Sequence, residues 1–371
     1  MSVISLSKPN ISKKEISLIS KSLKSGWLTH GPNNLIFEKN FSKYIKTKYA
    51  ISMNSCTSAL ECALKALDKK GEIIIPSWTW VSTANAVLNT GNTPVFADVD
   101  LNSRNLTADL IKKKITKKTI GVIVVHYAGL PCQMKQIHTL IKKKKLYLIE
   151  DSAETLGAKC DNKYTGSFGI GCFSFFPTKN ITTTEGGMLT TNNKRIYEKI
   201  KLIIAHGINK KLKKHFWNRE SSLAGHNFRL PNHLALLGIS QLKRLKKFNS
   251  KRLNIAKKYD KFLKSYNGFF KIQKIDKNLT HSYQMYTFLV NGSYRNNLLY
   301  YLRSKKIEAS AHFDPPLHKQ KYLSKYSNKS LKNTNLLAKQ IISLPIYPDL
   351  RDLEIYKIKK TINEWYKKNV L

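Results

Sequence analysis

Short, nearly continuous runs of isoleucine and valine are the feature that most limits what this chain can fold into. One run covers Ile73 to Ile75 and stops at Pro76, a helix is expected at 81–88, and a second strand at 94–98. The segments "TIGVIVVHYAG" and "KLYLIEDSAE" repeat the pattern around a Lys-rich helical segment at 134–145. Apolar strands that alternate with helices are typical of a parallel sheet buried on both faces. The sequence therefore predicts an α/β fold with a mainly parallel sheet.

The pattern changes near residue 245. From about Lys243 a long Lys-rich helix, "QLKRLKKFNSKRLNIAKKYDKFLKSY", leads into a mixed segment in which "SYQMYTFLV" is the expected strand. We predict a large α/β domain over residues 1–245, whose N-terminal segment can pack elsewhere, and a small C-terminal α+β domain over residues 246–371. A chain of 371 residues is long enough to bury both cores.

The charge of the chain is unusual. Sixty-five lysines and arginines against 23 acidic residues give a formal net charge of +42, which by itself suggests a nucleic-acid partner. The lysines are spread along the whole chain, however, and no RNA-binding aromatic motif or zinc-finger spacing accompanies them. We interpret most of the charge as a solvated surface and expect no specific nucleic-acid partner.

Cysteine spacing and hydropathy bear on the compartment. The five cysteines form no CxxC pair and have no histidines at metal-binding spacing; they are Cys56, Cys62, Cys132, Cys160 and Cys172. We expect free thiols in a reducing cytoplasm and no metal site. No stretch approaches the roughly 18 consecutive apolar residues of a membrane helix, and no signal peptide is visible. The expectation is a cytoplasmic protein without a membrane partner.

Asp151 and Lys179 suggest the chemistry of the chain. Asp151 ends an apolar strand, and Lys179 follows in the polar stretch "FFPTKNITTTEGG". A pyridoxal phosphate (PLP) enzyme needs both groups, because a carboxylate pairs with the pyridinium nitrogen and a lysine forms the Schiff base. The helix start in "MNSCTSAL" offers backbone N–H groups and the hydroxyls of Thr57 and Ser58 to a phosphate. From the residues alone, an ordinary helix cap and a strand-end turn carboxylate stay open as alternatives.

Ten ordered segments resemble the sugar aminotransferases of the DegT/StrS type, which are PLP-dependent enzymes of fold type I. The resemblance is dense from about residue 25 to 245 and resumes at "SAHFDPPLHKQKYL". The ten segments are "GWLTHGPNNLIFEKNFSKY", "NSCTSAL", "PSWTWVSTANAV", "PVFADVD", "VHYAGLPCQM", "IEDSAETLGAK", "GCFSFFPTKNITTTEGGMLTT", "AHG", "GHNFRL" and "LGISQLKRL". The resemblance implies a seven-stranded, mainly parallel sheet and a homodimer in which each site uses residues of both subunits.

The resemblance also implies a role for each matching residue. Lys179 resembles the Schiff-base lysine, which also moves a proton between substrate and cofactor, and Asp151 resembles the partner of the pyridinium nitrogen. Trp80 resembles the aromatic residue that stacks on the cofactor ring, with a core tryptophan as the alternative. The other implied cofactor contacts are Glu154 near the ring hydroxyl, Ser174, Thr57 and Ser58 at the phosphate, and Asn227 at the phosphate in the neighbouring subunit. A surface role for Glu154 and a turn role for Asn227 stay open.

The same resemblance implies a substrate. His312 and His318 are expected to face a sugar nucleotide, with a structural role as the alternative for each, and Arg229 is expected near the diphosphate. The implied reaction transfers an amino group from a donor such as L-glutamate to a nucleotide-linked keto sugar, with a 4-keto-6-deoxyhexose as the expected acceptor. Amination at carbon 3, dehydration, or a basic nucleic-acid-binding role on the same fold are the alternatives. Lys179 argues against dehydration, because the sibling PLP sugar dehydratases carry histidine at that position.

Two residues depart from the family pattern. Thr184 stands where the usual "TTGEGG" has a glycine, and Cys56 stands where "NSGT" has one. Each adds a side chain where the backbone is expected to approach the cofactor closely. We therefore expect the local geometry of the cofactor site to differ at these two positions.

Overall fold

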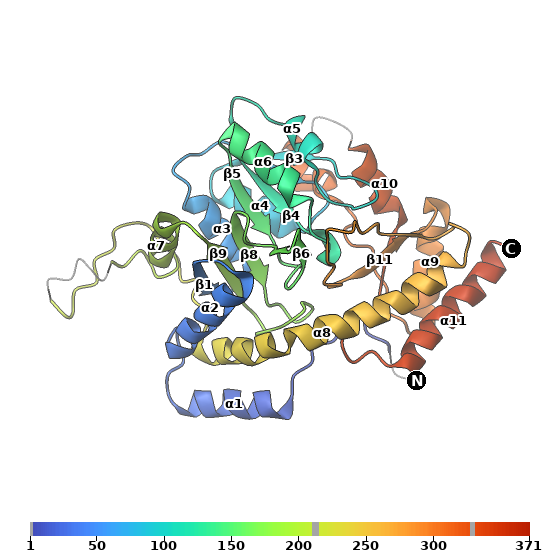
Figure 1. Ribbon diagram of the computed structural model, residues 1–371, viewed down its shortest axis with the longest axis horizontal. Coiled ribbons are helices and arrows are strands. Elements are labelled where there is room, and N and C mark those ends of the chain that lie inside the picture. The colour runs from blue at the N-terminus through green and yellow to red at the C-terminus, as the bar shows by residue number, and fades with distance from the viewer. Residues whose placement is uncertain (1–2, 210–214, 327–330) are drawn as a thin grey trace.

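A seven-stranded sheet forms the centre of the computed structural model, which describes residues 3–209, 215–326 and 331–371 (Figure 1). Its strand order is β1-β9-β8-β5-β4-β2-β3, and every neighbouring pair is parallel except the two that involve β9. The strands are β1 (Tyr49–Met53), β2 (Glu72–Pro76), β3 (Thr93–Ala97), β4 (Thr119–Val125), β5 (Tyr147–Asp151), β8 (Ile170–Ser174) and β9 (Gly187–Thr191). The predicted mainly parallel α/β fold is confirmed.

Both faces of this sheet are covered by helices, which explains why its strands are apolar throughout. Ile73 and Ile75 belong to a core shared with α3 (Cys56–Lys65), α4 (Val81–Asn89) and α7 (Lys194–Ile203). Ile74, between them, belongs to a different core, which it shares with α5 (Ala108–Lys112) and α6 (Met134–Lys144). Alternate residues of a strand point to opposite faces, so a strand buried on both faces needs an unbroken apolar run.

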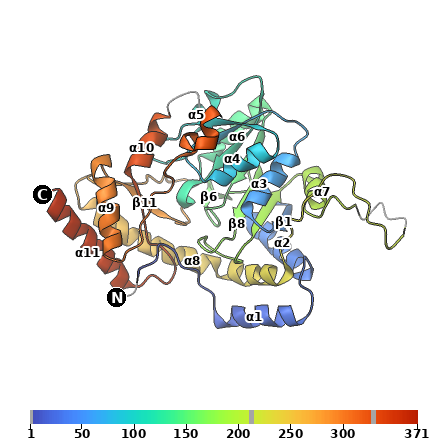
Figure 2. The same ribbon diagram turned by 180° about the vertical axis from the view of Figure 1, so that it is seen from behind.

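Two helices, α2 (Pro32–Ile45) and α8 (Asn232–Lys264), pack against β1, β8 and β9. The ring of Phe41 on α2 meets those of Phe173 and Phe175 edge to face, at centroid distances of 5.0 and 5.7 Å. The predicted domain boundary at residue 245 falls inside α8, which runs unbroken from the large sheet to the C-terminal part (Figures 1 and 2). Helix α1 (Lys13–Lys24), which begins at a capping box of Ser12 and Glu15, packs along α8.

The C-terminal part has its own antiparallel sheet and its own core. Tyr259, Phe288 and Trp365 are buried in that core. The N-terminal segment packs here and away from the large sheet, since Ile4 pairs with Ile307. The strands are β10 (Lys271–Ile272), β11 (Tyr286–Leu289) and β12 (Ile341–Leu344), and the helices are α9 (Gly292–Ser304), α10 (Lys332–Gln340) and α11 (Asp352–Asn369). Strand β11 is shorter than the "SYQMYTFLV" segment in which it was expected.

The remaining elements are short. A two-stranded hairpin consists of β6 (Lys159–Cys160) and β7 (Lys163–Tyr164), and 3₁₀ turns lie at Tyr127–Gly129, Leu317–Lys319 and Lys321–Tyr326. Within the described ranges, no helix is both long and apolar enough to cross a membrane, and no group of acidic, histidine or cysteine side chains is arranged to hold a metal ion. All five cysteines are free thiols.

Candidate active site

A cavity of about 460 Å³ opens at the carboxyl ends of β4 and β5 and is lined by residues of both sheets. The large domain contributes Val125 and Asp151 from these strand ends and Lys179 from the segment between β8 and β9. The C-terminal part contributes Gln284 and Ser343, and the N-terminal segment also reaches the cavity. Ligands of open α/β folds bind at the carboxyl ends of the strands, so this cavity is the candidate active site.

Asp151 is the last residue of β5 and only 5% exposed. Its Oδ2 accepts a hydrogen bond from Thr83 Oγ1 at 2.9 Å, and its Oδ1 accepts one from the backbone N–H of Ala153 at 3.2 Å. Among the residues that the structure describes, it has no ion-pair partner. Burial raises the pKa of this carboxyl, although the hydrogen bond from Thr83 acts in the opposite direction. A buried carboxylate without a cation is suited to bind a protonated nitrogen of a ligand.

Lys179 reaches the same cavity and is largely buried there. Its Nζ lies 3.6 Å from Oε1 of Glu154, and the two side chains are only 17% and 8% exposed. Glu154 is held in turn, because its Oε2 accepts the backbone N–H of Ala128 at 2.7 Å. The structure thus brings Lys179, Glu154 and Asp151 together, as the sequence predicted for a shared site.

The first turn of α3 forms a second polar wall of the cavity. Cys56 and Thr57 line it, and Ser174 at the end of β8 lines it as well. Backbone N–H groups in the first turn of a helix have no partner inside the helix and favour an anion. Ser58 does not line the cavity, since its N–H and its hydroxyl both bond within the cap of this helix. Of the hydroxyls predicted to contact the phosphate, those of Thr57 and Ser174 therefore belong to residues that line the cavity, whereas Ser58 does not line it.

Two neighbouring tryptophans lie in different surroundings. Trp78 is 1% exposed and packs in an apolar core, with its ring centroid 5.9 Å from that of Tyr127. Trp80 is 61% exposed, lies at the N-cap of α4, and lines the cavity with its ring centroid 6.1 Å from that of Phe313. A core role was the alternative for Trp80, but Trp78 is the tryptophan that has this role. The Trp80 ring is open to stack on a planar ligand.

The two histidines of the "HFDPPLH" segment also differ. His312 lines the cavity, with its Nδ1 3.0 Å from Oγ of Ser343, and burial lowers the pKa of its ring. His318 does not line the cavity: its Nδ1 lies 2.7 Å from Oγ of Ser77 and its Nε2 lies 3.1 Å from Oδ1 of Asn335. Because both ring nitrogens of His318 have partners inside the chain, its geometry matches the structural alternative.

Asn227 and Arg229 lie outside the cavity of their own chain. Asn227 is exposed, and its Oδ1 accepts a hydrogen bond from Nε of Arg229 at 3.1 Å. Arg229 forms an isolated β-bridge with Met53 at the end of β1, which fixes the backbone of this segment against the large domain. The predicted contact of Asn227 with the cofactor of a neighbouring subunit stays a prediction.

Thr83 and Gln284 are site residues that sequence reasoning missed. Thr83 is fully buried on α4 and bonds to Asp151 from behind the cavity wall. Gln284 lines the cavity, donates from Nε2 to the carbonyl of Thr178 at 3.1 Å, and has no partner for Oε1 in the described part of the chain. The helical pattern at 81–88 could have shown that Thr83 faces inward, whereas nothing local to Gln284 signals its place.

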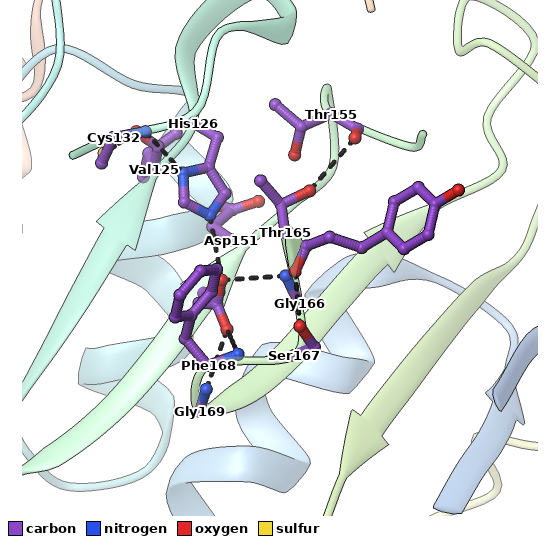
Figure 3. Close-up of polar contacts among 12 residues, drawn as sticks. Val125, His126, Cys132, Asp151, Thr155, Thr165, Gly166, Ser167, Phe168 and Gly169 are labelled. Atoms are coloured by element: carbon purple, nitrogen blue, oxygen red, sulfur yellow. Dashed lines mark hydrogen bonds and ion pairs between the residues drawn. The ribbon is translucent and has the colours of Figure 1, made fainter. Parts of the chain in front are cut away.

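Glu150 holds a buried polar network beneath the site, and Figure 3 labels its partners His126, Gly166, Phe168 and Gly169. It precedes Asp151 on β5, and neighbouring strand residues point to opposite faces. His126 Nε2 lies 3.2 Å from the Glu150 carboxylate, and His126 Nδ1 accepts the backbone N–H of Cys132 at 3.1 Å, so the ring proton is on Nε2. The carboxylate also accepts, at 2.8, 2.7 and 2.8 Å, the backbone N–H groups of Gly166, Phe168 and Gly169. The sequence signal for this network was Glu150 itself, an acidic residue next to the apolar run of β5.

The two departures from the family pattern are visible in the geometry. Thr184 has a φ of +66°, in the left-handed region that favours glycine, so its side chain costs about 1 kcal/mol of backbone strain. Cys56 lines the cavity with its Sγ 4.0 Å from Oδ1 of Asp151, and burial raises the pKa of this thiol. Cys56 therefore narrows the cavity beside the carboxylate.

The comparisons with known proteins agree with one another, and each covers nearly the whole chain. The sequence model of the DegT/DnrJ/EryC1/StrS aminotransferase family matches residues 9–363. The chain is 34% identical to GDP-perosamine synthase of Escherichia coli O157:H7, over 99% of each sequence. It is 33% identical to the spore coat polysaccharide biosynthesis protein SpsC of Bacillus subtilis, over 96% of this chain and 95% of that protein. Among solved structures, Helicobacter pylori PseC, an aminotransferase involved in the biosynthesis of pseudoaminic acid, matches with a TM-score of 0.93 and 30% identity, over 99% of this chain and 100% of PseC.

Proposed function

We infer the acceptor from the family: the chain belongs to the DegT/DnrJ/EryC1/StrS aminotransferase family and is a PLP-dependent sugar aminotransferase. We propose that this acceptor is a nucleotide-linked 4-keto-6-deoxyhexose. L-Glutamate would supply the amino group, and the amino sugar formed would enter a surface polysaccharide or glycan. The names of two relatives support this choice, since one is a synthase of GDP-perosamine and another serves spore coat polysaccharide biosynthesis.

The residues of the cavity fit PLP, the cofactor that aminotransferases of this family use; solved relatives hold it or pyridoxamine phosphate. The observation that carries the proposal is that Lys179 lines one cavity together with the buried carboxylate of Asp151, which has no ion-pair partner among the described residues. When bound, PLP supplies an electron sink that stabilises negative charge at the carbon bearing the amino group.

Three parts of the cavity wall would hold this cofactor, at its ring nitrogen, its ring face and its phosphate. The Asp151 carboxylate would keep a proton on the ring nitrogen, because a buried negative charge favours the cationic form of its partner. Trp80 would cover one face of the ring and exclude water from it. Thr57, Ser174 and the N–H groups at the start of α3 would bind the phosphate.

Lys179 would act twice in the reaction. It would hold the cofactor covalently between turnovers, and once released it would move a proton at Nζ to and from the substrate carbon. Glu154, 3.6 Å away, stabilises the positive charge that Nζ carries while it holds this proton. His312 and Ser343, on the wall formed by the C-terminal part, would donate and accept hydrogen bonds with sugar hydroxyls.

We propose that the working unit is a homodimer with shared sites. In the described chain, Lys179 is the only basic side chain other than histidine that lines the cavity, against three carboxylates. A nucleotide diphosphate and the carboxylates of glutamate need more positive charge than one lysine offers. Asn227 and Arg229 of the partner subunit would supply contacts that one chain lacks.

An exposed apolar surface supports this assembly. Trp27, Leu28, Leu35 and Ile36, which lie before and within the first turns of α2, are 54%, 52%, 63% and 49% exposed. Asn232 at the start of α8 ties the backbone of Trp27 and Leu28 to the segment that follows Arg229. Apolar surface of this kind, next to the residues proposed to cross between subunits, fits a second copy of the chain.

Absorbance spectroscopy with PLP tests the proposed site. The wild type should show a visible band that excess L-glutamate removes, while Lys179→Ala should lack the band and the exposed lysine control Lys43→Ala should keep it. A panel of nucleotide-linked keto sugars, followed by product analysis, then identifies the acceptor and the carbon aminated. A wild type that binds no PLP would refute the site, and amination at carbon 3 would refute the proposed acceptor.

Mixing inactive subunits tests the dimer. Lys179→Ala and Asn227→Ala homodimers should each be inactive or nearly so. An equimolar mixture should regain up to about a quarter of wild-type activity, because about half of its dimers are hybrids and one of the two sites in each hybrid has both native residues. No recovery on mixing and refolding, although tandem purification of differently tagged subunits shows hybrids forming, would contradict shared sites.

A further inference from the structure

The hydroxyl of Thr83 is bonded to the carboxylate that faces the cavity but does not reach the cavity itself. Thr83 is 0% exposed on α4, and its Oγ1 lies 2.9 Å from Oδ2 of Asp151. It is the one hydrogen-bond partner of Oδ2 within the described chain, whereas Oδ1 has the N–H of Ala153 at 3.2 Å and the thiol of Cys56 at 4.0 Å. Thr83 therefore touches the carboxylate from the side opposite to a ligand.

A second threonine fixes the direction of this hydrogen bond. Thr79 Oγ1 lies 3.2 Å from Thr83 Oγ1, and Thr79 lines the cavity. An ionised carboxylate only accepts, so the single hydroxyl proton of Thr83 goes to Asp151. Thr79 must then be the donor to Thr83. The result is a chain of two hydroxyls, Thr79 to Thr83 to Asp151, in which each bond polarises the next.

We propose that Thr83 is a positioning residue for the cofactor: its hydroxyl fixes the orientation and the charged form of the Asp151 carboxylate, so that this group holds the proton on the pyridine nitrogen. The inference rests on PLP lying in this cavity. Each carboxylate oxygen offers two lone pairs, and Thr83 occupies one on Oδ2. Without that hydroxyl the carboxylate loses one of its two well-directed donors and is free to turn about its last bond.

Three variants separate positioning from simple stability. Thr83→Val keeps the shape and removes the hydroxyl, and Thr83→Ser keeps the hydroxyl. Thr90→Val removes a buried hydroxyl at the end of the same helix, which bonds to the Ala86 and Val87 carbonyls and to Nδ2 of Asn92 and has no bond to Asp151. If Thr83→Val is insoluble, Thr83→Ala takes its place. The readouts are the PLP dissociation constant from quenching of tryptophan fluorescence, the pH dependence of the visible band, and the rate with L-glutamate.

We expect Thr83→Val to bind PLP about 10-fold more weakly, to shift the pH dependence of the band, and to react with L-glutamate at least about 10-fold more slowly at an unchanged KM. Thr83→Ser should stay within about 3-fold of the wild type, and Thr90→Val should lower the melting temperature without changing the spectrum. The inference is overturned if Thr83→Val matches the wild type, if Thr83→Ser is equally impaired, or if Thr90→Val changes the spectrum in the same way. A wild type without a Lys179-dependent band would instead overturn the proposed function.

Discussion

Replacing Glu150 with glutamine tests how much the buried network beneath the cavity contributes to stability. The change keeps the side-chain shape and removes its charge. In the native network Oε1 accepts the N–H groups of Phe168 and Gly169, while Oε2 accepts those of Gly166 and His126. The oxygen of a glutamine can still accept the N–H groups of Phe168 and Gly169. Its NH₂ group then faces the N–H groups of Gly166 and His126, and two donors cannot bond to each other. No histidine tautomer relieves this, because His126 Nδ1 must accept the N–H of Cys132.

The expected cost follows from the two lost bonds. A hydrogen bond to a charged group contributes about 1.5–3 kcal/mol, and an unsatisfied buried donor costs a similar amount, so Glu150→Gln should destabilise the fold by about 3–6 kcal/mol. That is a large share of the roughly 5–15 kcal/mol by which proteins are stable. In a chain of this size the melting temperature should fall by about 4–8 °C.

Thermal unfolding of the protein without PLP, followed by circular dichroism, is the assay. Glu198→Gln, an exposed glutamate on α7, is the matched control and should melt within about 1 °C of the wild type. Glu150→Gln melting within about 2 °C of the wild type would refute the reasoning, because it would mean that the network tolerates two facing donors.

Three further predictions concern the cavity and the N-terminal helix. Asp151→Asn should bind PLP more weakly and lower the rate with L-glutamate by about 100-fold or more, measured by stopped-flow absorbance, because a neutral amide does not hold a proton on the ring nitrogen. His312→Asn should raise KM for the keto sugar about 10-fold and leave the melting temperature unchanged. His318→Asn should lower the melting temperature and leave KM within about 2-fold of the wild type. The reverse pattern would contradict the geometry. Burial of Glu15 acts to raise the pKa of its carboxyl, but hydrogen bonds from Ser12, Arg244 and Ser240 outweigh this and hold the pKa below its ordinary 4.5. A lowered pKa stabilises the fold above pH 4.5, and this gain is lost as the pH falls through the lowered pKa. Glu15→Gln should therefore melt lower than the wild type at pH 7, and the difference should shrink as the pH falls below 4.5.

Local patterns in the sequence were sufficient to predict the mainly parallel sheet and to single out two residues that line the candidate site. The run Ile73 to Ile75 predicted a strand buried on both faces, and the structure shows its alternate residues in two different cores. Asp151 at a strand end and Lys179 in a polar segment predicted a cofactor site, and both line one cavity. These features are local because strand burial depends on alternation along the chain, and the carboxyl ends of parallel strands meet at one edge.

Tertiary structure decided which of several similar residues line the cavity. Trp78 and Trp80 are two positions apart, and His312 and His318 share one segment, yet only the second tryptophan and the first histidine line the cavity. Gln284 enters it because the C-terminal sheet packs against the large domain. Such contacts join segments more than a hundred residues apart, and they depend on strand order and on how the two parts pack, which no periodicity along the chain encodes.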